Sequence, residues 1–216
     1  MNFSEILGTL WQEEAIGSLV VAAIHAGSER RSEYGTAGEP DYMGRGNRAD
    51  RYRDFILEEL LPDLFLMYPS IDKDSVSAAG FSLGGLTAMD LVWHHPDRFR
   101  SAAVFSGSFW WRSVAQEDPV YSDDLHRIMH QRVRRSAIRS DQRFFFQCGV
   151  MDEQKDRNQN GIIDSIDDTL DLIEELVSKG VSRSTQIYYL ELVDGKHDIP
   201  SWARAFPFFL RWNYGK

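Results

Sequence analysis

The sequence predicts an α/β fold in one domain, with a mainly parallel sheet and helices on both faces. Two observations predict it. Short apolar runs alternate with segments of helical periodicity along the 216 residues, and a glycine-rich turn, GFSLGG at 80–85, joins one such run to one such segment. Alternation of this kind is typical of parallel sheets with right-handed crossovers. No repeat or low-complexity tract divides the chain, so we expect one domain over residues 1–216.

Five segments are predicted to be strands. The first, SLVVAAIH at 18–25, is apolar along almost its whole length, as expected for a parallel strand that is covered on both faces. The other four are rich in small, β-branched or aromatic residues. They span residues 75–81, 101–107, 143–150 and 185–193.

Five further segments are predicted to be helices. RADRYRDFILEELLPDLF at 48–65 repeats apolar residues at helical spacing. Pro96 stops the segment at 83–96, Ser122 is an expected N-cap, and Gly180 has the position of a C-terminal cap. The remaining helical segments are 122–138, 164–180 and 199–212.

Composition and charge limit the classes of partner that the protein could bind. A formal net charge of −9 and a pI near 5.1 disfavour nucleic acid and anionic membranes as partners. The one basic segment, 126–143, is interpreted as a solvated helix, because its arginines fall on several faces. The single cysteine, Cys148, lies in an apolar run and is expected to be a core residue.

Location is expected to be cytoplasmic. No apolar stretch reaches the roughly 18 residues that span a bilayer. The opening MNFSEILGTLWQEE lacks the basic region of a signal peptide. A periplasmic or secreted location is the alternative if the true N-terminus lies upstream of this one.

Ser82 is the candidate nucleophile. It lies between a predicted strand and a predicted helix, with Gly80 and Gly84 at the two positions where a sharp nucleophile elbow needs small residues. The helix N-terminus stabilises negative charge there, and the backbone N–H of Leu83 would face a developing oxyanion. The alternative is a passive serine in a tight turn.

A nucleophilic serine needs a base and an orienting acid, which in this class of sheet follow it in the order acid, then histidine. His197 lies after the last predicted strand. His126 and His130 are interpreted as a surface pair, and His94 and His95 as helix C-terminal residues. Asp152, after the strand at 143–150, is the preferred acid, with Glu153 and Asp156 as alternatives.

These residues resemble those of the esterase family that includes enterochelin esterase, esterase D and feruloyl or acetyl xylan esterases. The resemblance rests on GFSLGG, CGVMDE, SGSFWW, YRDFILEELLPDL and GKHDIPSWARAFPFFLRW, in that family's order within the chain from about residue 10 onward. It implies an α/β-hydrolase fold and ester hydrolysis, with Ser82 as nucleophile, His197 as base and Asp152 as acid.

The resemblance also implies a difference. Family members begin with further strands, one of which ends in a loop that donates a second oxyanion N–H, whereas this chain opens at what resembles the following helix. We therefore expect an N-terminally shortened fold, lower solubility than an upstream-extended chain, and activity weakened by roughly 10²–10³.

The segment DRNQNGIIDSID at 156–167 has the spacing of a calcium loop. Aspartate at the twelfth position, where glutamate is usual, predicts a lowered affinity. The alternative is a polar loop whose Asp164 caps the next helix. A structural calcium is expected at most, and no cofactor is required; the ligands would be Asp156, Asn158, Asn160, the Ile162 carbonyl, Asp164 and Asp167.

The leading hypothesis is a serine esterase that acts on a small-molecule or carbohydrate ester. The alternatives are acyl transfer by the same triad and a non-catalytic binding module of the same fold. Four side chains are candidates for the substrate pocket, with core packing as the alternative for the tryptophans: His25, Trp110, Trp111 and Trp202. The sequence does not indicate the oligomeric state.

Overall fold

The computed structural model describes residues 1–137 and 141–216. Its described residues form one sheet of four parallel strands in the order β1-β2-β3-β4. Four of the five predicted strands are therefore confirmed, with shifted ends. The strands are β1 (Ser77–Phe81), β2 (Ser101–Phe105), β3 (Arg143–Met151) and β4 (Ile187–Lys196).

The two faces of the sheet bury two separate hydrophobic clusters. Because side chains alternate along a strand, Phe144 and Phe146 of β3 point to one face and Phe145 points to the other. All three rings are fully buried. This burial on both sides explains why the strand at 143–150 is apolar without alternation.

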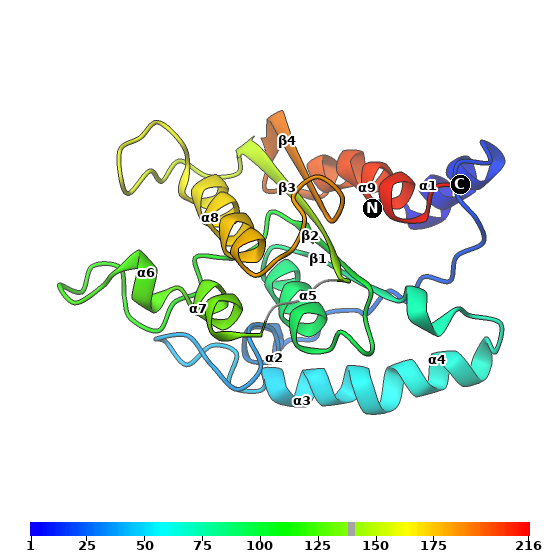
Figure 1. Ribbon diagram of the computed structural model, residues 1–216, viewed down its shortest axis with the longest axis horizontal. Coiled ribbons are helices and arrows are strands. Elements are labelled where there is room, and N and C mark those ends of the chain that lie inside the picture. The colour runs from blue at the N-terminus through cyan, green and yellow to red at the C-terminus, as the bar shows by residue number, and fades with distance from the viewer. Residues whose placement is uncertain (138–140) are drawn as a thin grey trace.

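Helices cover both faces (Figure 1). One face packs against α5 (Leu83–His94), α7 (Ile128–Arg135) and α8 (Asp164–Ser178), and the opposite face packs against α1 (Phe3–Gln12) and α9 (Ile199–Tyr214). The predicted three-layer α/β arrangement is thus confirmed. Among the described residues, no helix is both long and apolar enough to cross a membrane.

The predicted helix at 48–65 is present as three consecutive segments, α3 (Ala49–Asp54), a π-helical turn (Phe55–Leu60) and α4 (Leu61–Met67). Proline lacks an N–H and crowds the carbonyl one turn earlier, so Pro62 favours the wider hydrogen bonding just before it. Smaller elements complete the described chain: α2 (Arg30–Glu33), a 3₁₀ turn (Lys73–Ser75) and α6 (Asp123–His126).

The predicted strand at 18–25 is wrong for this structure. Residues 17–27 form no regular element, and Val20, Val21 and Ile24 are 45%, 42% and 38% exposed. An apolar run becomes a strand only where a neighbour supplies ladder hydrogen bonds, and among the described strands β1 pairs with β2 alone. The apolar composition of residues 18–25 favours burial, but in this structure the segment stays partly exposed.

The predicted helix at 122–138 is interrupted. Arg127 adopts an extended conformation between α6 and α7, where its backbone bridges to Arg112. Ser122 has the N-cap position of α6 but makes no side-chain cap bond. Part of the predicted helix and of the basic segment 126–143 lies at 138–140, outside the described residues.

The prediction that 126–143 is a solvated helix is wrong within the described residues, and so is the prediction that His130 lies on the surface. Arg127 is 4% exposed and His130 is 1% exposed. Burial lowers the pKa of His130 to about 3, so this histidine is a neutral interior group. Cys148, in contrast, is buried as expected, and burial raises its pKa to about 12.

Candidate active site at the carboxyl edge of the sheet

Ser82 occupies a strained turn between β1 and α5. Its backbone has φ 55° and ψ −121°, a region that costs a non-glycine residue about 1–3 kcal/mol. Neighbouring backbone holds it there. The Ser82 N–H donates to the Phe105 carbonyl at the end of β2 (2.9 Å), and the Ser108 N–H donates to the Ser82 carbonyl (3.2 Å).

The small residues of the elbow, residues 80–85, are required by packing. A Cβ on Gly80 would lie 2.0 Å from the Gly84 carbonyl oxygen, far inside contact distance. A Cβ on Gly85 would lie 3.0 Å from Val104 Cγ1. The start of α5 therefore crosses directly over β1, which leaves Ser82 at the apex of the turn.

The start of α5 suits a developing negative charge. Leu83 is the first residue of α5, so its N–H has no acceptor within the helix. Oriented amides and the helix dipole favour an anion at this position. The Ser82 side chain is half-buried, which combines access for a substrate with partial exclusion of water.

Asp152 follows β3 directly. Its Oδ2 accepts the Gly149 N–H at 3.0 Å, while its Oδ1 is buried and has no hydrogen-bond partner among the described residues. Burial raises the pKa of this carboxyl, and the Gly149 amide, the Ser106 side chain and the charge of His197 act in the opposite direction. One oxygen is thus fixed and the other is an open acceptor.

His197 follows β4 directly and is exposed. Its ring meets the Trp202 ring edge to face, with centroids 5.2 Å apart. Met151 pairs with Lys196, so Asp152 and His197 leave neighbouring strands at one level, and the charge of His197 lowers the pKa of Asp152. No hydrogen bond joins Ser82, His197 and Asp152 to one another among the described residues. Catalytic hydrogen bonds often tighten only when substrate is bound.

The two alternative acids have other partners. Glu153 Oε1 accepts the Ser165 N–H in the first turn of α8 at 2.8 Å. Asp156 accepts the N–H groups of Asn160 and Gly161 within its own loop. Asp152 is therefore the carboxyl of this set that lies beside His197 with an oxygen free.

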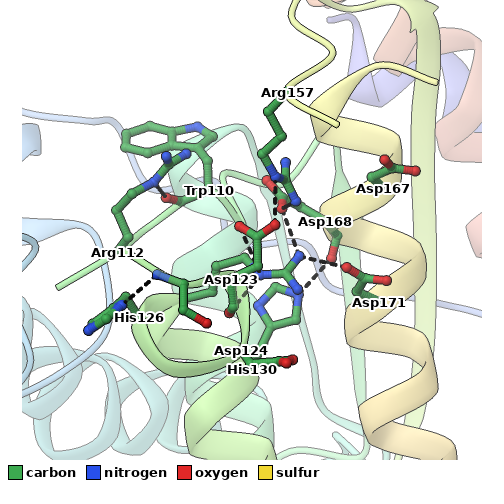
Figure 2. A network of polar contacts seen from close by, with 12 residues as sticks. Trp110, Arg112, Asp123, Asp124, His126, His130, Arg157, Asp167, Asp168 and Asp171 are labelled. Carbon is green, nitrogen blue, oxygen red and sulfur yellow. Dashed lines mark hydrogen bonds and ion pairs between the residues drawn. The ribbon is translucent and has the colours of Figure 1, made fainter. Parts of the chain in front are cut away.

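A network of ion pairs around the buried Asp168 carboxylate joins the loop after Asp152 to α6 and α8, and no single segment of the sequence predicts it (Figure 2). Arg157 binds Asp123 of α6 (2.9 Å) and Asp168 of α8 (2.7 Å). Arg127 binds the same Asp168 oxygen at 2.9 Å, and its guanidinium also reaches Asp171 at 2.8 Å. Because the basic segment and the loop lie far apart in the sequence, no local pattern could have paired them.

Among the candidate pocket residues, Trp110 is partly exposed, and the Arg45 guanidinium stacks over its ring at 4.9 Å. Trp111 is fully buried against Gly35 and Gly46, where an added Cβ would lie 2.7 and 2.8 Å from its ring. The half-buried Trp202 lies beside His197, as described above. His25 is exposed in the irregular segment 17–27.

The loop at 156–167 is folded back on itself. Asn158 and Asn160 both donate side-chain hydrogen bonds to Asp167 Oδ2, at 3.0 and 2.9 Å. Asp164 does not cap α8 but accepts the Arg157 N–H at 2.7 Å. Within the described chain, no three His, Cys, Asp or Glu side chains are grouped so that they could hold a metal ion.

An elbow serine at the carboxyl edge of a parallel sheet, followed in the chain by an aspartate and a histidine at the same edge, defines the hydrolase class of α/β folds. The chain matches the family described as "Putative esterase" over residues 1–212 and belongs to that family. The family resemblance inferred from the motifs is therefore confirmed.

Curated relatives match over a short region. The iron(III) enterobactin esterase of Escherichia coli K12 is 40% identical over 57 residues, which is 26% of this chain and 14% of that protein. The enzyme of the same name from Dickeya dadantii is 42% identical over 60 residues, or 27% of this chain and 14% of that protein. The matched region thus spans about a seventh of each relative's length.

Solved structures share the fold. Enterobactin esterase from Shigella flexneri, solved in the presence of enterobactin, superimposes with a TM-score of 0.70 and 22% identity over 96% of this chain and 45% of that one. A ferulic acid esterase gives a TM-score of 0.65 and 19% identity over 98% and 75%. At such identities the likeness establishes the α/β-hydrolase fold alone.

Replacement of glycine by alanine should have opposite effects on stability at Gly80, in the elbow, and at Gly8, in α1. Gly80→Ala places a methyl group against the Gly84 carbonyl, so we expect a loss of about 1–3 kcal/mol in unfolding free energy and loss of any Ser82 reactivity. Gly8→Ala, in α1 with no neighbour within 4 Å, should stabilise by about 0.5–1 kcal/mol. Urea unfolding measures both. Equal stabilities would contradict the packing argument.

Proposed function

We propose that this protein is a serine esterase that cleaves carboxylic esters through an acyl-enzyme on Ser82. His197 is the general base and Asp152 the orienting acid. The observation that carries the proposal is the strained Ser82 backbone at the start of α5, at the same carboxyl edge of the sheet as a buried Asp152 oxygen that lacks a hydrogen-bond donor among the described residues. Membership of an esterase family supports the reaction class.

The steps follow from the residues at this edge. His197 takes the Ser82 proton as Oγ attacks the ester carbonyl, and the Leu83 N–H stabilises the resulting oxyanion. The protonated imidazole then gives its proton to the leaving alcohol. Water, activated by His197, releases the acid from Ser82. The open Asp152 Oδ1 is the acceptor that fixes the imidazole orientation and stabilises its positive charge.

The substrate is proposed to be a small-molecule or carbohydrate ester. Trp110 under Arg45 offers a flat, cationic wall that suits an aromatic group. Similar proteins are named as esterases of enterobactin and of ferulic acid, which supports a small-molecule or carbohydrate ester as the class to test first.

The first test is reaction at Ser82. The wild-type protein should be labelled by a fluorophosphonate and should hydrolyse p-nitrophenyl acetate, whereas Ser82→Ala should do neither. Ser108→Ala is a matched control, since this buried serine contributes its backbone N–H and not its side chain to the elbow. Peptide mapping should place the label on Ser82.

The outcomes separate the alternative functions. A folded wild-type protein that neither labels nor turns over would indicate a non-catalytic binding module. Transfer of the acyl group to an added alcohol or sugar, in preference to water, would indicate an acyltransferase. The expected weakening of activity by a single oxyanion donor stays a prediction, and comparison with an upstream-extended chain measures it.

Asp152→Asn should make the protein more stable and less active. Because burial raises the Asp152 pKa in the folded state, the stability that the protonated carboxyl contributes is complete at low pH and is lost as pH rises through that raised pKa. An uncharged amide avoids this loss, so the variant should melt at a higher temperature at pH 7. Its kcat should fall by about 10⁴.

Melting temperatures measured at low pH provide a control for the Asp152→Asn substitution. Below the ordinary carboxyl pKa both proteins carry an uncharged group at position 152, so their melting temperatures should converge. A variant that is less stable than wild type at pH 7, or equally active, would show that Asp152 is not the buried charge that serves His197.

We also propose that the loop at 156–167 binds a structural calcium. Its oxygen donors are of the type that calcium prefers, although Asp164 is already held by Arg157. Calcium should raise the melting temperature with a midpoint near 10⁻⁴–10⁻³ M, and EDTA should reverse the change. Asp156→Asn should abolish the response, and Asp72→Asn, in an exposed turn, should not. An unchanged melting temperature at 10 mM calcium would refute the site.

A further inference from the structure

Ser106 occupies a second strained position at the same edge. It follows β2 directly, is 2% exposed, and has φ 48°. Its N–H donates to the Gln147 carbonyl of β3 at 2.7 Å, and the preceding Phe105 carbonyl accepts the Ser82 N–H. A non-glycine residue keeps such a backbone only where its surroundings require it.

The Ser106 side chain joins two parts of the candidate site. Its Oγ accepts a hydrogen bond from the Trp202 indole N–H at 2.9 Å. The Ser106 side chain also acts on Asp152, where it lowers the pKa of the carboxyl that the Gly149 N–H holds by its other contact. A hydroxyl has one proton to give, and because Trp202 occupies an acceptor site, that proton is left for the carboxylate.

Trp202 extends the connection to the base and to the elbow. Its ring stacks on Phe81, the residue before Ser82, with centroids 5.2 Å apart and planes 25° apart. The same indole ring also contacts the His197 ring in an edge-to-face arrangement, with centroids 5.2 Å apart and planes 83° apart. Rotation of the indole would therefore disturb the histidine.

We propose that Ser106 and Trp202 are a positioning pair for the proposed hydrolysis, in which the Ser106 hydroxyl fixes the acid and the Trp202 ring fixes the base. The inference rests on the proposed function and goes beyond the triad. Ser106 touches neither substrate nor reacting atoms. It acts by holding Asp152 and Trp202 at a set separation, so that His197 lies between the open Asp152 oxygen and Ser82.

The pair is tested with Ser106→Ala, Trp202→Phe and the double variant. Ser106→Ala should lower kcat for p-nitrophenyl acetate about 10-fold to 100-fold with little change in KM, because it alters alignment and not binding. Trp202→Phe keeps a ring but removes the N–H and should have a similar effect. The double variant should lose little more than the larger single loss, because the two side chains act through one contact.

A readout that does not need turnover is the titration of Asp152, followed through its side-chain carboxyl ¹³C signal. Without the Ser106 hydroxyl the carboxylate loses a donor, so the Asp152 pKa should rise, and the acid limb of kcat/KM should move to higher pH with it. Trp202→Phe leaves the hydroxyl free to turn away and should shift the titration in the same direction. That variant serves if Ser106→Ala does not fold.

Ser101→Ala is the matched control. Ser101 begins the same strand, is fully buried, and shares a hydrogen bond with Ser77 Oγ at 2.5 Å. Its loss should cost stability of the same order, about 1 kcal/mol, without moving the Asp152 titration or the pH profile.

The outcomes separate this inference from the proposed function. An inactive, unlabelled wild type whose Asp152 titration still shifts in Ser106→Ala would refute the esterase and support the positioning contact. An active wild type whose Ser106→Ala variant keeps its kcat and its Asp152 titration, and loses only stability as Ser101→Ala does, would refute the positioning role.

Discussion

The close crossing of α5 over β1 is the contact on which the candidate site depends. Gly80 and Gly84 meet with no room for a side chain between them, so the chain can turn from strand to helix within one residue. That residue, Ser82, takes a positive φ, and the first turn of α5 then points its free N–H groups at the space beside the Ser82 side chain. A longer turn would relax the serine and move it away from the helix N-terminus.

Strand register places the other parts relative to this turn. Phe81 pairs with Phe105, and Phe105 pairs with Gln147, so Ser82 and Ser106 emerge at equivalent points of neighbouring strands. β3 and β4 continue beyond that level and pair as far as Met151 and Lys196. Asp152 and His197 therefore leave the sheet together, one step further out, where the acid can be half-buried while the base remains accessible to a substrate.

Much of this arrangement could be predicted from local sequence. The glycines of the elbow, the apolar strand at 143–150 and the helices that follow β1 and β3 all carry patterns that depend on neighbouring residues alone. Ser82, Asp152 and His197 could be selected because each follows a predicted strand. The position after β2 satisfies the same rule, but Ser106 has no further local signal, because its partners Trp202 and Asp152 lie far away in the chain.

The failures share one cause, which is dependence on distant partners. The run at 18–25 has the composition of a buried strand, yet a strand exists only where a neighbour pairs with it. His130 and Arg127 have the spacing of a surface helix, yet Asp168 and Arg157, about 30 to 40 residues away in the chain, complete a buried network around them. Periodicity reports which faces are apolar and carries no information about a charge that arrives from another segment.

The two edges of the sheet differ in backbone strain and in how completely their polar groups are hydrogen-bonded. At the amino edge, Ser77 binds Ser101 and the Tyr214 hydroxyl at 2.5 Å each, and its backbone is unstrained. At the carboxyl edge, Ser82 and Ser106 both have positive φ, and a buried Asp152 oxygen lacks a donor among the described residues. Glycine at positions 82 and 106 would remove the backbone strain, and an amide at position 152 would remove the buried charge. Packing alone therefore does not explain the residues that are present. The concentration of strain and buried charge around one serine is what a site that sacrifices stability for chemistry would show.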